Sequence, residues 1–318
     1  MRAALVTSFD QAPRYRDCPD PTPTGPHETV VDVLAAGLHP RVRSQAAGSH
    51  YTSTDTLPLV PGIDGVGRDA GGTLRYFVLP DTTLGSMAER TVIDVRRSVA
   101  LPDDADPVLL AAAMNPAMSS WVALRRRIDF RAGQRVVVLG ATGNAGRLAV
   151  EVARHLGAGA VTAVGRRAEL LAELEGVDHA VLLADRDALG AAGGDADVVL
   201  DYLWGPATVE AMYAIVPRRV DDAQRLTWVQ IGSVAGLEAP IPSAALRATR
   251  LELVGSGQGS VAARDIVAEL GELAAEIGRG TFAVDAVAVP LADVEQAWVD
   301  AATSRQRLVV TPSPPRAG

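Results

Sequence analysis

The segment from Val136 to Gly146 constrains the fold of this chain more than any other part of its sequence. It consists of VVVLGATGNAG, in which four apolar residues precede glycines at every third position. The apolar run predicts a short buried strand, and residues 147–156 have the apolar spacing of a helix. The segment therefore predicts a strand, a tight turn and a helix in immediate succession.

Turns of this kind commonly hold the phosphates of a dinucleotide. The first two glycines permit a sharp turn and a close approach to a pyrophosphate, and the third lets the helix pack closely on the strand. The N–H groups of the first helical turn then face the phosphates. A second predicted strand at 160–164 completes the unit, and a turn without a phosphate is the alternative. The predicted cofactor contacts here are Gly140, Thr142, Gly143, Asn144, Ala145 and Gly146.

The end of the second strand distinguishes the two common nicotinamide dinucleotides. NAD sites usually carry an acidic residue there, about 20 residues beyond the turn, for the ribose hydroxyls. This chain has Gly165, Arg166 and Arg167 instead. Two guanidinium groups suit a 2′-phosphate, whereas a helix N-terminus alone disfavours cations. We therefore expect NADPH rather than NADH, and the alternative is that both arginines are merely solvated.

The composition limits the partners of the chain. With 318 residues, 48% of them hydrophobic, it is long enough for two domains with cores of their own. No run approaches the roughly 20 apolar residues that span a membrane, and no signal-peptide pattern is visible. The net charge of −8 argues against a nucleic-acid surface. We expect a cytoplasmic protein that acts on a small molecule and binds neither nucleic acid nor membrane.

Two residue types exclude several chemistries by their scarcity. Cys18 is the single cysteine, which excludes an intrachain disulfide and a zinc site built on cysteine clusters. Lysine is absent and all 30 basic residues are arginine, which excludes Schiff-base catalysis and a lysine proton donor. The scarcity of cysteine also fits a reducing compartment.

The order of the predicted elements divides the chain. Residues 1–113 are mostly strand and loop, which is typical of a β-rich, barrel-like domain. Helical spacing follows over 108–114 and 119–126, and we expect Asn115-Pro116 to interrupt it, because a residue before proline resists helix. Apolar strands then alternate with helices, which predicts an α/β fold with a parallel, doubly wound sheet.

Six short segments occur in an order that resembles a known superfamily. They are VDVLAAGLHP at 31–40, VPGID at 60–64, GSMAE at 85–89, DVVLD at 197–201, QIGS at 230–233 and VPLADV at 289–294. With the glycine turn they resemble the medium-chain dehydrogenase/reductase superfamily, and within it the zinc-free branch similar to quinone oxidoreductases. The resemblance implies a Rossmann NADP(H)-binding domain over 114–261, a GroES-like barrel domain for the substrate over 1–113 and 262–318, and a homodimer.

The sequence departs from the zinc-dependent members of that superfamily. His39 stands where they have a cysteine, Ile63-Asp64 stands where they have a His-Glu pair, and their cysteine-rich lobe is missing. We therefore expect no metal site. His39 also differs from the asparagine usual in quinone reductases. The glycine turn alone resembles NADP-binding short-chain sensor proteins too, but those carry it at the start of the chain.

The resemblance places three candidate catalytic residues near the substrate. Tyr51 precedes the VPGID turn, His39 follows a strand end, and Asn115 stands where the chain enters the cofactor domain. The alternatives are that Tyr51 packs on the barrel rim, that His39 orders its turn, and that Asn115 caps a helix starting at Pro116.

Further candidates lie near the expected nicotinamide and phosphates. Ser119 accompanies Asn115, and Gly232 and Ser233 end a parallel strand at its carboxyl edge, where ligands bind in such sheets. Arg147 is expected to face either a phosphate or only solvent.

These observations lead to one functional hypothesis and its alternatives. We expect an NADPH-dependent, metal-independent oxidoreductase that reduces an activated C=C bond of an enone, enoyl or quinone-type substrate by hydride transfer. The alternatives are a reductive cyclase or carbonyl reductase of specialised metabolism, and an NADPH-binding sensor without turnover.

Overall fold

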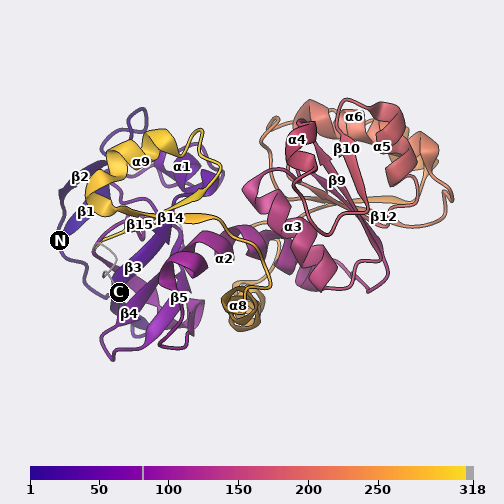
Figure 1. The fold of residues 1–318 in the computed structure, drawn as a ribbon. Helices are drawn as coiled ribbons and strands as arrows, with labels where there is room; N and C mark the ends of the chain where they lie inside the picture. Colours follow the sequence, from indigo (N-terminus) through magenta and orange to yellow (C-terminus); the bar gives the residue numbers. More distant parts are fainter. Residues whose placement is uncertain (81, 313–318) are drawn as a thin grey trace. The chain divides into compact units, whose positions relative to one another are not determined.

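The computed structural model describes residues 1–80 and 82–312, and the chain forms two compact units. One unit comprises Met1–Asn115 and Ala263–Gly318, and the other comprises Pro116–Ala262 (Figure 1). Each unit has a hydrophobic cluster of its own. The chain therefore leaves the first unit once and returns to it at the end.

The first unit is built around a seven-stranded sheet that takes strands from both ends of the chain. Its strand order is β14-β15-β3-β4-β5-β7, and β6 pairs with β3 beside this path. Val309 of β15 lies opposite Gly37 of β3 in an antiparallel pair, so the C-terminal segment completes the sheet. The strands are β3 (Glu28–Gly37), β4 (Asp64–Asp69), β5 (Leu74–Val78), β6 (Arg90–Asp94), β7 (Ser98–Ala100), β14 (Ala286–Pro290) and β15 (Arg307–Thr311), with a separate pair β1 (Arg2–Leu5) and β2 (Arg14–Asp17).

Three helices accompany this sheet, and two of them share one hydrophobic cluster. The helices are α1 (Pro40–Ala46), α8 (Ala263–Gly278) and α9 (Val294–Asp300). Val42 of α1 and Trp298 of α9 are buried in the same cluster as Val310 of β15. Full burial of side chains of this size contributes about 1.5–3 kcal/mol each. This packing joins the C-terminal segment to the N-terminal one.

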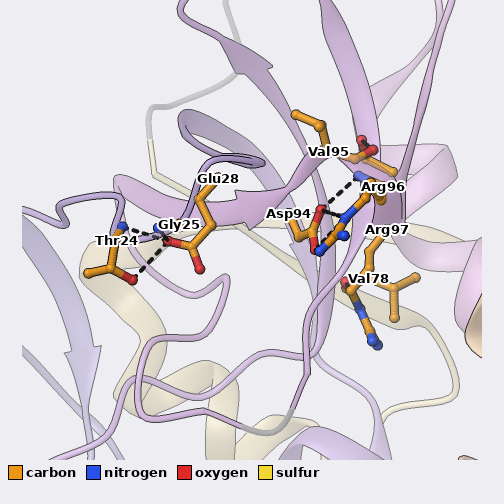
Figure 2. Close-up of polar contacts among 9 residues, drawn as sticks. Thr24, Gly25, Glu28, Val78, Asp94, Val95, Arg96 and Arg97 are labelled. Carbon is orange, nitrogen blue, oxygen red and sulfur yellow. Dashed lines mark hydrogen bonds and ion pairs between the residues drawn. The ribbon is translucent and has the colours of Figure 1, made fainter.

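Two acidic residues lie at opposite positions of neighbouring strands at one end of the sheet, and each carboxylate points to donors of its own (Figure 2). Glu28 on β3 lies opposite Asp94 on β6, and like charges in such positions destabilise a ladder. Glu28 accepts hydrogen bonds from the N–H groups of Thr24 and Gly25, at 2.6 and 2.9 Å, which lower its pKa. Asp94 accepts a bond from Nη2 of Arg96 at 2.6 Å, which helps to lower its pKa to about 2.

The helix α2 (Pro107–Val122) corrects one expectation. We predicted a break at Asn115-Pro116, but the helix runs through both residues and continues as a π-helical turn over Ala123–Arg127. A proline inside a helix costs about 3 kcal/mol through its missing N–H and its ring. Extensive burial offsets that cost. The fully buried residues of α2 include Ala111, Ala113, Met114, Ala117 and Trp121. Asn115 therefore lies inside a helix and does not cap one.

The same helix is longer and more apolar than the sequence analysis expected of any segment. Over Pro107–Arg127 it has 21 residues and is apolar enough to cross a membrane by length and composition alone. However, 67% of its apolar window is buried inside the structure, as is typical of a core helix. It is therefore weak evidence for a membrane span.

The second unit contains a six-stranded, wholly parallel sheet, which confirms the predicted α/β fold. Its strand order is β10-β9-β8-β11-β12-β13, so the order reverses between β8 and β11. In Figure 1, α3 lies on one side of this sheet and α5 and α6 on the other. The elements are β8 (Arg135–Leu139), α3 (Asn144–His155), β9 (Ala160–Gly165), α4 (Ala168–Leu171), β10 (His179–Leu182), α5 (Arg186–Gly193), β11 (Val198–Asp201), α6 (Gly205–Ile215), β12 (Leu226–Gln230), α7 (Ala245–Ala248) and β13 (Leu251–Gly255).

The central strands of this sheet are buried on both faces, which explains their continuous apolar sequences. Val137 and Leu139 of β8 share a cluster with Trp228 of β12 and with Met212 and Ile215 of α6. Helices on both faces of a parallel sheet leave little room for polar side chains within it. Polar and ligand-binding groups are therefore expected at the strand ends.

Candidate active site

The glycine turn has the backbone geometry that its sequence predicted. Gly140, directly after β8, has φ 86°, and its N–H donates to the carbonyl oxygen of Val164 at 3.0 Å. The Gly143 N–H donates to the Gly140 oxygen at 3.1 Å and closes the turn. A Cβ on Gly146 would lie 2.2 Å from that same oxygen, so no side chain fits there. The helix α3 can pack against the turn only because position 146 is glycine.

The N-terminus of α3 is open to an anion. No side chain caps the helix at Gly143, so the first-turn N–H groups of Asn144, Ala145 and Gly146 lack a capping acceptor there. A Cβ on Gly143 would have one near neighbour, the Gly140 oxygen at 3.5 Å, so the space in front of the turn is free. Open N–H groups at the positive end of a helix of this length suit a phosphate. The residues present therefore fit the pyrophosphate of a dinucleotide.

The end of β9 lies directly against this turn. A Cβ on Gly165 would come within 2.8 Å of the methyl group of Thr142, so a side chain at position 165 would force Thr142 to shift. Arg166 and Arg167 follow and are exposed. Within the described part of the chain, neither guanidinium has an ion-pair partner. Two uncompensated cations beside an open helix N-terminus fit the extra phosphate of NADPH.

Arg147 differs from these two arginines because it has an ion-pair partner. Its Nη2 lies 3.1 Å from a carboxylate oxygen of Glu173, so the side chain already has an anionic partner. Arg147 was expected to face either a phosphate or only solvent. In the structure it pairs with Glu173, which is neither of these.

At the carboxyl end of β11, two of the predicted nicotinamide-side residues, Ser119 and Gly232, lie against Tyr202. The hydroxyl groups of Ser119 and Tyr202 are 2.9 Å apart, and Ser119 also donates to the carbonyl oxygen of Pro116 at 2.6 Å. Because a serine hydroxyl has one proton, Tyr202 donates to Ser119. Burial raises the pKa of Tyr202 to about 12, so it remains a donor. Gly232 packs against the backbone just after the same strand, since a Cβ there would lie 2.7 Å from the backbone carbonyl oxygen of Tyr202.

Asp201 organises this strand end, a role that the sequence analysis missed. Its buried carboxylate accepts hydrogen bonds from the N–H groups of Leu203 and Trp204, at 2.8 and 3.0 Å. It also accepts the indole N–H of Trp228 at 2.9 Å and the hydroxyl of Thr208. The donors on both oxygens compensate the burial of this carboxylate. The DVVLD match contains this residue but indicates only a strand.

The first unit contains a second polar cluster, centred on His39. Nε2 of His39 lies 2.9 Å from Oδ1 of Asp64, and the hydroxyl of Tyr76 donates to Oδ2 of the same carboxylate at 2.7 Å. The three side chains are 2%, 1% and 0% exposed, respectively, so water does not screen these contacts. Burial and the nearby Asp64 raise the pKa of Tyr76 well above its ordinary value, so it stays a donor. Nδ1 of His39 has no partner among the described residues.

Arg307 on β15 adds a positive charge near this cluster. Burial lowers its pKa to about 10, and Asp64 opposes that shift, so the group is still charged at neutral pH. Its Nη1 donates to the carbonyl oxygen of Leu38 at 3.4 Å, next to His39, while its Nε lacks a partner in the described structure. The C-terminal strand thus brings a cation to a site that otherwise comes from residues 38–76.

Tyr51 and Asn115 are less buried than the residues of the His39 cluster. Tyr51 is 72% exposed, and its ring lies 4.2 Å from that of His50, centroid to centroid. Asn115 is half-buried inside α2. The catalytic roles given to Tyr51, His39 and Asn115, and the nicotinamide contacts given to Ser119, Gly232 and Ser233, stay predictions.

The described residues contain no group of three His, Cys, Asp or Glu side chains that could hold a metal ion together. A cavity of 510 Å³ does occur in the second unit, but it lies at the amino ends of β8, β9 and β10, away from the glycine turn. Its charged residues include Arg135 and Asp195, which pair with each other. The carboxyl edge remains the better candidate site, because its open N–H groups and uncompensated arginines point to a ligand.

Comparisons with known proteins extend these observations. No family model matches the chain. Over 98% of its length it is 33% identical to the whole of a probable NADPH-dependent quinone reductase from Emericella nidulans. The chain belongs to the quinone oxidoreductase-like branch of the medium-chain dehydrogenase/reductase superfamily.

Two further relatives agree with this family. The quinone oxidoreductase from Thermus thermophilus, also solved in complex with NADPH, superposes with a TM-score of 0.82 over 98% of this chain and 100% of that one, at 26% identity. An NADPH-dependent alkenal/one oxidoreductase from Arabidopsis thaliana is 28% identical over 173 residues, which are 48% of this chain and 44% of that protein. The two matches that span nearly the whole chain include the residues before the glycine turn, which the short-chain sensor proteins lack.

Proposed function

We propose that this chain is an NADPH-dependent, metal-independent oxidoreductase that reduces the activated C=C bond of an enone, enoyl or quinone-type substrate. The observation that carries the proposal is the uncapped glycine turn of α3 with Arg166 and Arg167 beside it. This arrangement occurs in a chain that matches a probable NADPH-dependent quinone reductase over 98% of its length. NADPH is the cofactor, with its pyrophosphate at Gly143–Gly146 and its 2′-phosphate at the two arginines.

Each of the two units has its own role in the proposed reaction. The unit Pro116–Ala262 binds the cofactor, and the unit that contains His39 and Tyr51 binds the substrate. Bound NADPH supplies a hydride. The substrate gains that hydride at its β-carbon and a proton at its α-carbon, so the protein must stabilise negative charge on the carbonyl oxygen and deliver one proton.

His39 is the group best arranged for that task. Nε2 donates its hydrogen bond to Asp64, and Nδ1 is buried without a partner among the described residues. A substrate would therefore reach Nδ1 only after the side chains that cover it move. Donation from this ring to the carbonyl oxygen requires Nδ1 to carry a hydrogen while Asp64 holds Nε2. Tyr51 and Asn115 serve to position the substrate or to complete the proton path.

Metal independence rests on the donor set around His39. The zinc-dependent members of the superfamily use a cysteine and a His-Glu pair at the places of His39 and Ile63-Asp64. Here one of those places is apolar, and His39 and Asp64 bond to each other at 2.9 Å. Activity should therefore be unchanged after prolonged treatment with EDTA.

The test is the oxidation of NADPH by the purified protein with a panel of enones, quinones and simple ketones. Deuterium from 4-deuterated NADPH should appear at the β-carbon of an enone product. Turnover of simple ketones alone would favour a carbonyl reductase, and a cyclised product would favour a reductive cyclase. Tight NADPH binding without turnover of any compound would favour the sensor and overturn the proposal.

Two variants assign the substrate-side residues. His39→Asn and Tyr51→Phe should each lower kcat while leaving the Kd of NADPH unchanged, because both lie in the unit that does not hold the phosphates. An unchanged kcat would remove the residue from the mechanism.

A homodimer and a cytoplasmic location complete the proposal. β13 pairs with β12 and has no second partner strand among the described residues, and its residues Leu251–Val254 are only half-buried. Pairing with a second copy would protect this edge. Sedimentation should give twice the 33.1 kDa mass of one chain, and a monomer would contradict the dimer.

A further inference from the structure

Trp204 has a backbone conformation that tryptophan rarely adopts. Its φ is 55° and its ψ is −167°, close to a region of the conformational map that is essentially reserved for glycine. Trp204 is the one non-glycine residue with positive φ in the described part of the chain. Its N–H is fixed by the carboxylate of Asp201 at 3.0 Å, which holds the backbone in this state.

Packing of the Trp204 side chain in the protein core does not offset the energetic cost of this backbone conformation. The indole is half-buried, and it is not among the residues that form or border the hydrophobic cluster of the second unit. Trp228, whose indole N–H also donates to Asp201, is by contrast fully buried in that cluster. Folding alone would therefore favour glycine at position 204.

The position of Trp204 offers a reason for its retention. Asp201 lies opposite Leu139, the last residue of β8, so Trp204 comes three residues beyond the strand pair at which the sheet order reverses. A Cβ on Gly140 would lie 3.0 Å from Leu203, so this segment touches the glycine turn directly. On its other side the Leu203 oxygen accepts the N–H of Ala235 at 2.8 Å, which joins it to the loop after Gly232 and Ser233. Trp204 thus follows directly on a segment that contacts both the glycine turn and the loop after Gly232 and Ser233.

We propose that the indole of Trp204 is a contact surface for one of the flat rings of bound NADPH, and that the chain keeps a strained tryptophan for this contact. The inference rests on the proposed binding of NADPH at this edge. Both the adenine and the dihydronicotinamide ring have the flat face that stacks on an indole. Binding of a cofactor fragment that contains only the adenine ring can distinguish which of the two rings stacks on Trp204.

The variants Trp204→Gly and Trp204→Leu test the proposal by two independent measurements. The Kd of NADPH, measured by calorimetry, should rise about five- to tenfold in both, because each loses the aromatic face. Thermal unfolding without cofactor should show Trp204→Gly more stable by about 2–4 °C, since glycine adopts this conformation freely. Trp204→Phe is the matched control, which keeps both the ring and the strain and should bind NADPH within about twofold of the original chain.

Fragments of the cofactor identify the ring. If adenine stacks on Trp204, the Kd of 2′,5′-ADP should rise in Trp204→Gly and Trp204→Leu as much as that of NADPH. If dihydronicotinamide stacks there, 2′,5′-ADP should bind all variants equally while NADPH does not. Unchanged NADPH binding in both variants would overturn the inference, as would a loss of stability in Trp204→Gly. Failure of the original chain to bind NADPH would instead overturn the proposed function.

Discussion

The two units hold their candidate functional groups in different ways. In the second unit the groups proposed to bind phosphate are backbone N–H groups, in a turn that has no side chains at Gly140, Gly143 and Gly146. In the first unit the groups are side chains, and His39, Asp64 and Tyr76 meet because β4 and β5 pair beside the loop that precedes α1. A site made of backbone needs glycines at fixed spacing, whereas a site made of side chains needs only that distant segments pack correctly.

This difference predicts the largest effect at Gly146. In Gly146→Val the new Cβ would lie 2.2 Å from the Gly140 oxygen and 2.8 Å from the Cα of Ala141, so backbone would have to move. We expect a loss of more than about 3 kcal/mol in stability and no measurable NADPH binding. Thermal unfolding and calorimetry measure the two quantities.

Gly143→Ala is the matched control within the same turn. Its Cβ would meet only the Gly140 oxygen at 3.5 Å, so the fold should survive, while the methyl group blocks the approach of a phosphate. Stability should change by less than about 1 kcal/mol, and the Kd of NADPH should rise about tenfold. Equal damage by both variants would break the view that position 146 serves packing and position 143 serves the ligand.

The side-chain cluster should respond in the opposite pattern. Asp64→Asn weakens two buried hydrogen bonds to a carboxylate, from His39 and Tyr76, so we expect a loss of about 2–3 kcal/mol in stability and a lower kcat. The Kd of NADPH should not change, because we propose that the phosphates bind to the other unit. The control is Asp32→Asn, which changes an exposed residue on β3 and should change stability by less than about 0.5 kcal/mol.

The same contrast explains what the sequence could reveal. The glycine turn, the arginine pair and the parallel sheet were predictable because local spacing determines them. Tyr76 and Arg307 were not, since each looks like an ordinary strand residue until its strand is placed beside His39. Asn115-Pro116 misled because the rule against helix before proline is local, whereas the burial that offsets it along α2 comes from the tertiary structure. Trp204 gave no signal because its strain depends on the Asp201 carboxylate.

The arginine pair sharpens the assignment of the backbone site to one cofactor. Replacing both Arg166 and Arg167 by alanine should raise the Kd of NADPH about 30-fold and leave that of NADH unchanged, because only NADPH has the 2′-phosphate that we propose they bind. Arg218→Ala, which removes an exposed arginine paired with Asp187, should affect neither ligand. A similar loss for both dinucleotides would contradict the phosphate role.

The smallest expected effect tests whether the cost at Asp64 is specific to its burial. Asp94 belongs to the same unit but is partly exposed, and Arg96 helps to lower its pKa from 3.8 to about 2. A carboxyl group with a lowered pKa stabilises the fold above its unfolded pKa, and that stabilisation is lost as the pH falls toward the folded value. Asp94→Asn should therefore lose up to about 1 kcal/mol at pH 7, and the difference should shrink between about pH 4 and 2. Denaturant unfolding at several pH values measures this, with the exposed Asp104→Asn as the control. A loss at pH 7 as large as that of Asp64→Asn would mean that any carboxylate of this sheet is equally costly to remove, and the buried His39 cluster would then have no special claim to a function.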